Sequence, residues 1–139
     1  MKTLPESENP LVLRTDFSNQ AIWMRICAII REPVGELNFV ANVDCLDDVK
    51  YKDASKDELL SCVPHEYAHS FMIVVDQTAV LQPDHPLLVI DLQGEPGREF
   101  RAIPSQIQAI ENNLSIANMG FEEFAEAVDA SGVFRGFEA

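Results

Sequence analysis

The sequence predicts a single α/β domain built on a mixed five-stranded sheet with about four helices. Short β-branched segments such as 70–76 alternate along the chain with apolar patterns of helical spacing. The first three predicted strands are joined through helices, which favours parallel pairing by right-handed crossovers. Only nine residues separate Asp76 from Pro86, too few for another parallel crossover. The last two strands are therefore expected to form an antiparallel hairpin.

Length and composition set the domain boundaries. A chain of 139 residues with 47% hydrophobic and 24% charged residues is typical of one globular domain with a real core. Residues 1–10 are polar and contain two prolines, so we expect a flexible tail followed by a domain over 11–139. No apolar run is long enough to cross a bilayer, and the first residues lack the apolar region of a secretory signal. These features predict a cytoplasmic location.

The first half of the chain supplies two strands and a helix. LVLRT at 11–15 predicts a short buried strand. Ser18 is the expected N-cap of a helix whose wide apolar face ends before Pro33. NFVANVD at 38–44 alternates between apolar and polar residues and predicts the second strand. A charged loop over 44–53 is expected to follow it.

Later elements follow from capping and turn signals. Ser55 and Glu58 form a capping-box pattern, which predicts a second helix that stops near Pro64. Pro104 is placed to begin a third helix, and an acidic amphipathic fourth helix begins at Phe121. The remaining strands are predicted at 70–76, 86–92 and 98–103.

The stretch HEYAH at 65–69 matches the H-E-x-x-H pattern of zinc hydrolases. In those enzymes two histidines one helical turn apart, here His65 and His69, hold the metal. That arrangement needs a continuous helix, but Pro64 stands directly before the motif and a strand pattern begins directly after it. The longer pattern with a third histidine ligand is absent. Zinc hydrolysis is therefore a disfavoured alternative.

Three aspartates follow the predicted strands. Asp16, Asp44 and Asp76 each stand at or just past the carboxyl end of a strand, so parallel pairing would bring them to one edge of the sheet. Carboxylates suit Mg²⁺, which makes a metal-dependent enzyme the alternative function. Aspartate is also common where strands meet turns, because its side chain caps local backbone. Asp91 belongs to the antiparallel fourth strand and is excluded.

The three cysteines argue for reduced thiols. Cys27, Cys45 and Cys62 are odd in number, far apart in sequence and free of any C-x-x-C pair, so a disulfide framework is not expected. Cys27 lies within the apolar face of the first helix and is expected to be a small core residue. A nucleophile formed by Cys62 with His65 or His69 is disfavoured, because no orienting group accompanies it.

The net charge is −13, from 10 basic and 23 acidic side chains. Such a chain repels nucleic acid and anionic membranes and favours a basic protein partner, although a surface serving solubility alone gives the same charge. The leading hypothesis is a non-catalytic, cofactor-free interaction protein, for example an immunity protein that blocks a toxin. Partner identity and oligomeric state stay open. The candidate interaction residues are Asp47, Asp48, Asp53, Asp57, Glu122, Glu123, Glu126 and Asp129.

Several stretches are distinctive together: LVLRTDFS (11–18), VVDQT (74–78), HPLLVIDL (85–92) and REFRAIPSQIQAIENNLSIANMGFEEFAEAV (98–128). They resemble a family of small acidic bacterial proteins, mostly from actinomycetes, that is catalogued as a domain of unknown function. The resemblance covers residues 10 to 137. It implies no activity and assigns no catalytic residue.

Overall fold

Six strands form one mixed sheet in the order β2-β1-β3-β4-β5-β6 in the computed structural model, which describes residues 3–137. β1 pairs in parallel with both β2 and β3, whereas β4 runs antiparallel to β3 and to β5. The mixed α/β domain is therefore confirmed, with one strand more than predicted. The strands are β1 (Leu11–Arg14), β2 (Asp44–Leu46), β3 (Phe71–Val75), β4 (Leu87–Asp91), β5 (Glu99–Ala102) and β6 (Val133–Phe134).

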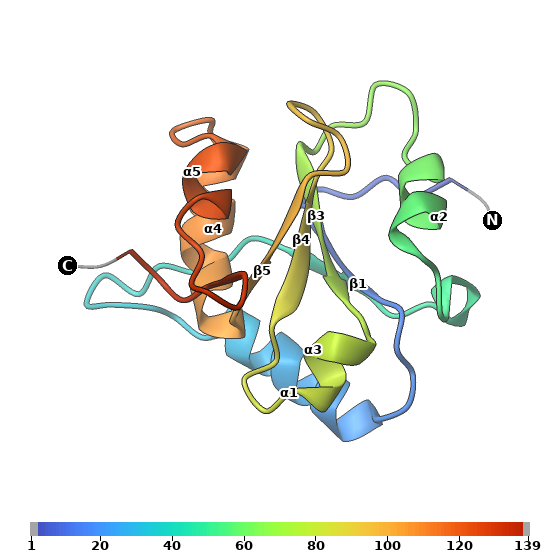
Figure 1. The fold of residues 1–139 in the computed structure, drawn as a ribbon, viewed down its shortest axis with the longest axis horizontal. Coiled ribbons are helices and arrows are strands. Elements are labelled where there is room, and N and C mark those ends of the chain that lie inside the picture. The colour runs from blue at the N-terminus through green and yellow to red at the C-terminus, as the bar shows by residue number, and fades with distance from the viewer. Residues whose placement is uncertain (1–2, 138–139) are drawn as a thin grey trace.

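Within the described part of the chain, five α-helices surround the sheet, where about four were predicted (Figure 1). The additional helix is α3, which lies within the short link between β3 and β4 and is capped by the side chain of Asp76. The capping box of Ser55 and Glu58 is present at the start of α2, as predicted. The helices are α1 (Gln20–Arg31), α2 (Lys56–Ser61), α3 (Gln77–Leu81), α4 (Ile107–Ser115) and α5 (Phe121–Ala125), with 3₁₀ turns at Val49–Tyr51 and Pro104–Gln106.

The two crossovers of the parallel strands lie on opposite faces of the sheet. The first runs from β1 through α1 to the edge strand β2, and the second returns through α2 and passes β1 to reach β3. Right-handed connections in opposite directions along a sheet place their helices on opposite faces. Figure 1 shows α2 on one side of the sheet and α4 and α5 on the other. The chain therefore moves from β1 in one direction along the sheet to β2 and in the other direction to β3, and the point of reversal lies between β1 and β3.

Both faces of the central sheet are buried. Val12, Ile73 and Val89 face the larger core cluster, which includes the apolar sides of α1, α4 and α5. Their neighbours along the same strands face a smaller cluster formed with Tyr51 and Leu59. Every residue of β1, β3 and β4 is buried, which explains why these strands are almost uniformly apolar in sequence.

Five phenylalanines join α5 to the far edge of the sheet. The ring centroids of Phe124 and Phe134 are 5.2 Å apart, and those of Phe100 and Phe121 are 5.0 Å apart. Phe137 packs against both Phe124 and Phe134. Tilted and edge-to-face pairs of this kind stabilise a core beyond the area they bury. The short strand β6 and the short helix α5 depend on this cluster.

The second strand was predicted in the wrong place. Residues 38–43 are not a strand. Asn38 has a φ of 55°, and Phe39 forms an isolated antiparallel bridge with Val34. The pairing with β1 begins only at Asp44. A small hairpin therefore replaces the first part of the expected strand. Its Phe39 and Val40 side chains are exposed, whereas Val43, just before β2, is buried in the core.

The ends of the first strand and helix also differ from expectation. The N-cap of α1 is Asn19, whose side chain accepts a hydrogen bond from the Ile22 N–H, while Ser18 donates to the Asp16 carboxylate. In the region expected to be a loose tail, Leu4 is buried and its N–H donates to the Cys62 carbonyl at 2.8 Å. The described part of this segment thus packs on the domain.

We expect Phe124→Ala to lower the free energy of unfolding by about 3–5 kcal/mol, because the side chain is fully buried and its removal leaves a cavity. Phe137→Ala is the matched control. Phe137 is 52% exposed, so its truncation should cost about 1 kcal/mol or less. Urea unfolding followed by circular dichroism measures both. Equal costs for the two variants would contradict the arrangement of the aromatic cluster.

Candidate functional site

The three strand-end aspartates do not meet at one edge. Asp76 directly follows the carboxyl end of β3, and Asp16 closely follows that of β1. Asp44, in contrast, is the first residue of β2. In a parallel pair with β1, that position lies at the opposite edge. There the Asp44 carboxylate accepts hydrogen bonds from the backbone and side chain of Asn9 at 3.1 and 3.2 Å. The predicted set of three is therefore wrong, because the strand begins where it was expected to end.

Asp76 is engaged in holding the fold. Its carboxylate accepts two hydrogen bonds from Arg101 at 2.9 and 2.8 Å and a third from the Ala79 N–H at 3.1 Å. The same guanidinium donates to the Pro86 carbonyl. A bidentate arginine–carboxylate pair is among the strongest hydrogen-bonded contacts in proteins. Asp76 thus joins β3, α3 and β5 instead of facing a ligand alone.

A polar pocket of about 330 Å³ lies where the strand order reverses, between the carboxyl ends of β1 and β3. Open α/β sheets commonly bind ligands at this place. Its acidic lining residues are Asp16, Asp53 and Asp76, accompanied by Thr15 and Thr78. Within residues 3–137, however, no three side chains of His, Cys, Asp or Glu are grouped so that they could hold one metal ion.

The HEYAH segment is a loop rather than a helix. Residues 64–70 form turns and bends, and Glu66 has a φ of 61°, which no α-helix contains. His65 is exposed, whereas the His69 Nε2 lies 2.8 Å from the Ser7 carbonyl oxygen. The two imidazoles are therefore not presented on one helical face. This agrees with the interpretation that the motif match is a coincidence.

Arg14, at the end of β1, is a buried cation. Its side chain is only 3% exposed and its guanidinium lies over the rings of Phe17 and Trp23, with distances of 4.4 and 5.4 Å to the ring centroids. It also donates to Gln20 at 2.7 Å and to Asp47 at 3.3 Å. A buried arginine needs such partners. Asp47, expected to meet a binding partner, is therefore partly committed to Arg14.

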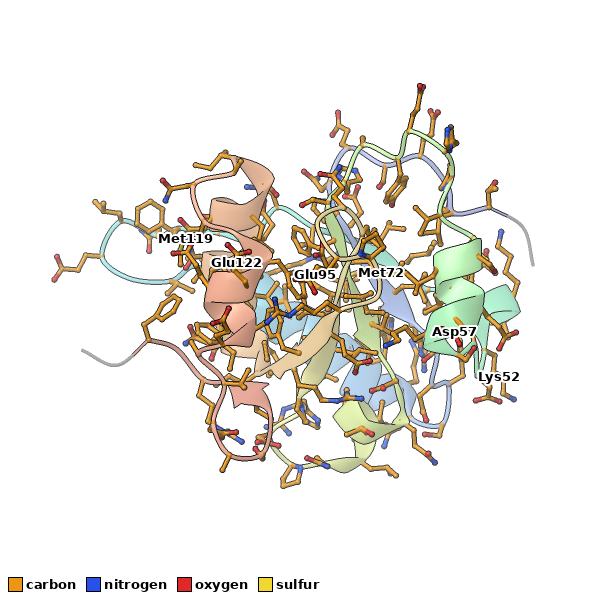
Figure 2. The ribbon with its side chains drawn as sticks, turned by 45° about the horizontal axis from the view of Figure 1, so that its top comes forward. Lys52, Asp57, Met72, Glu95, Met119 and Glu122 are labelled. Atoms are coloured by element: carbon orange, nitrogen blue, oxygen red, sulfur yellow. The ribbon has the colours of Figure 1, made fainter. Side chains whose placement is uncertain are left out.

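The eight candidate interaction residues lie on two separate surfaces. Figure 2 shows Asp57 and Glu122 on opposite sides of the sheet, one on the α2 side and the other at α5. On the α2 side, Asp48 pairs with Lys50 and caps the turn that contains it. The segment 47–58 holds five acidic residues but also three lysines. The charge on this side is mixed.

The α5 side is more uniformly acidic. Residues 121–131 contain four acidic residues and no basic one. Two of these carboxylates serve the fold: Glu123 accepts from the Gly120 N–H, and Asp129 accepts from Ser131 and Arg135. Those contacts, with Ser131 contributing most, hold the pKa of Asp129 below its usual range. Glu122 and Glu126 are exposed to solvent.

A cluster of exposed apolar side chains, which sequence analysis missed, stands on the same side of the molecule. Among the described residues, five of the nine exposed large hydrophobic side chains gather here. We call residues 34–40 the apolar hairpin. A groove of about 490 Å³ lies between this hairpin and α4. The exposed fractions are 38% for Val34, 77% for Leu37, 52% for Phe39, 43% for Val40 and 75% for Ile116.

Two of the cysteines, although far apart in sequence, meet in the structure. The Cys27 thiol on α1 hydrogen-bonds to Cys45 on β2, which raises the pKa of Cys27 well above its usual range and lowers that of Cys45. Cys27 is buried, as predicted, and Cys45 is half-buried. All three cysteines are free thiols. Cys45 is thus the thiol poised to ionise first within this pair.

Comparison with known families decides what the chain belongs to. A family model described as a domain of unknown function (DUF6924) matches residues 9–137. The chain belongs to the DUF6924 family. This confirms the resemblance to an uncharacterised family seen in the sequence. No curated protein matches this DUF6924 chain. Its helices, within residues 3–137, are too short or too polar for any of them to cross a membrane.

In this DUF6924 chain we expect Asp76→Ala to lower the free energy of unfolding by about 2–4 kcal/mol, because it removes a helix cap and leaves Arg101 without its partner. Glu8→Ala, at an exposed position, should change stability by less than about 0.5 kcal/mol. Urea unfolding measures both variants. A cost below about 1 kcal/mol for Asp76→Ala would contradict the structural role assigned to this carboxylate.

We expect Cys45 to be alkylated by iodoacetamide before Cys27 and Cys62, because its pKa is lowered and it is only half-buried. Peptide mapping by mass spectrometry measures the order. Cys27→Ala should slow the reaction at Cys45, since it removes the hydrogen bond that lowers the pKa. Cys62→Ala is the control and should leave the rate unchanged. Faster labelling of Cys27 than of Cys45 would contradict the pairing.

Proposed function

We propose that this protein is a non-catalytic binding protein that captures a basic protein partner through the acidic surface of α5. The observation that carries the proposal is the pair of exposed carboxylates at Glu122 and Glu126, in a segment with four acidic residues and no basic one. Glu126 is 70% exposed and lies 3.9 Å from Arg98, a weak surface contact. Both carboxylates are therefore available to cations on a partner.

The α5 surface suits a basic partner better than the α2 surface. On the α2 side, Lys50, Lys52 and Lys56 would repel incoming cations, and Lys56 already binds Glu99 at 2.7 Å. On the α5 side, the turn between β4 and β5 contributes Glu95, which is 72% exposed and lies 3.4 Å from Arg98. Complementary charge chiefly raises the rate of encounter and the specificity of such contacts. The candidate interaction surface is thereby reduced to one side of the molecule.

A metal-dependent enzyme built on strand-end carboxylates is less well supported. Its proposed ligand Asp44 lies at the edge of the sheet opposite to Asp16, and Asp76 is held by Arg101. A site for Mg²⁺ requires several oxygen ligands around one point. Asp16 and Asp53 remain as the carboxylates of the pocket at the strand-order reversal, and Asp16 is itself bound to Ser18.

We expect the double variant Glu122→Lys/Glu126→Lys to bind a fluorescein-labelled lysine–serine peptide about tenfold or more weakly than the unchanged protein at low salt, measured by fluorescence anisotropy. The control is Glu8→Lys/Glu66→Lys. It changes the net charge equally, at two exposed positions outside α5.

A smaller loss in the control is the expected result, because the surface of α5 is proposed to act locally. Equal losses in the two variants would show that only the total charge matters, and the proposal would be rejected. Circular dichroism checks that both variants are folded.

A further inference from the structure

Resting on the proposed function, we propose that the apolar hairpin is the anchor of the same binding surface, and that the partner presents an apolar segment flanked by lysine or arginine. The hairpin lies beside the carboxyl end of α4, and Ile116 stands between that helix and the start of α5. Figures 1 and 2 both show the hairpin on the side of the molecule that carries α4 and α5. The apolar and acidic side chains therefore lie on the same side of the molecule.

The hairpin is held in a defined shape. Val34 and Phe39 exchange backbone hydrogen bonds at 2.8 and 3.0 Å around a turn closed by the Asn38 N–H and the Gly35 carbonyl. Both Gly35 and Asn38 have positive φ, as tight turns require. The exposed side chain of Leu37 is thus carried at the tip of an ordered turn.

A buried carboxylate fixes the base of the hairpin to α4. Glu111 is only 3% exposed, and its Oε1 accepts a hydrogen bond from the Asn42 N–H at 2.7 Å. Asn112 donates to the Val40 carbonyl at 3.0 Å and also to Glu111. Burying a carboxylate carries a large desolvation cost, which these hydrogen bonds offset. The chain therefore orders this loop while leaving its apolar side chains in water.

The combination of shape and exposure indicates a binding surface. Clusters of exposed apolar side chains on a folded domain commonly mark interaction sites. An anchor that is already ordered loses little conformational entropy when it binds, so more of its burial contributes to affinity. Leu37 and Phe39 are the two largest side chains available at the hairpin, and the groove beside Phe39 offers space for an apolar group.

The charges around the hairpin favour a partner with basic residues. Glu32 and Glu36 flank its exposed side chains, and Glu122 follows Ile116 at the start of α5. A second copy of this chain would bring these like charges together, at a net charge of −13 per copy. A partner with basic residues around an apolar centre places opposite charges at each of these positions.

Two labelled peptides of equal charge test the inference by fluorescence anisotropy. One is a leucine–lysine peptide with leucines at helical spacing, and the other is the lysine–serine peptide. The unchanged protein is expected to bind the leucine–lysine peptide about tenfold more tightly. Leu37→Ser/Phe39→Ser should abolish this preference while leaving binding of the lysine–serine peptide unchanged.

The matched control is Val49→Ser/Leu81→Ser, which removes two apolar side chains that are 68% and 69% exposed on η1 (Val49–Tyr51) and α3. It should retain the preference. Loss of the preference in this control, or equal affinity of the unchanged protein for both peptides, would overturn the inference and leave the proposed function standing. If the unchanged protein binds neither peptide more tightly than the Glu122→Lys/Glu126→Lys variant does, the proposed function itself fails.

Two further outcomes would identify a different occupant. Sedimentation that shows self-association of the unchanged protein, lost in Leu37→Ser/Phe39→Ser, would assign the hairpin to a second copy and overturn the inference. Hairpin-dependent binding to phosphatidylcholine vesicles would assign the hairpin to a lipid surface and would also overturn the inference. Circular dichroism of the serine variants is expected to match the unchanged protein, because all four substituted side chains are exposed.

Discussion

Burial of the sheet on both faces is the constraint on which the rest of the structure depends. Every position of β1, β3 and β4 is inside the protein, so polar side chains occur only where these strands end. Asp76 and Asp91 stand there and cap local backbone, Asp91 by accepting from the N–H groups of Gln93 and Glu95. Carboxylates that satisfy buried or turning backbone in this way are poorly placed to act on a ligand. This is why we place the proposed function on the surface rather than at the strand ends.

The topology explains why one side of the surface carries the exposed apolar residues. α1 ends at Arg31, and the chain reaches β2 only at Asp44. A link of this length exceeds the usual helix–strand connection, and the chain uses it to fold a hairpin against α4. Because α5 follows α4 directly, the hairpin and the acidic helix share a side of the molecule. Neither feature would create this surface without the other.

Sequence patterns predicted the buried strands and the capping of α2 because those signals are local. The error at 38–44 arose because alternating apolar residues describe an exposed hairpin as well as a strand, and only tertiary pairing separates the two. That error also moved Asp44 to the wrong edge of the sheet. α3 and β6 were missed because they are too short to show periodicity. The apolar hairpin could have been suspected from Gly35 and Asn38, which favour a tight turn.

Net charge connects stability with binding. Repulsion among the exposed carboxylates opposes the compact state at low salt, and the carboxylates bound to Arg14, Arg101 and Arg135 contribute less to that repulsion because each has a paired cation. The exposed carboxylate of Glu122 and the weakly paired one of Glu126 keep more of that repulsion. The proposed basic partner would relieve this repulsion where it binds, and the hairpin would contribute apolar burial that salt does not screen. Electrostatic attraction would then set which partners approach, and the hairpin would determine which of them stay bound.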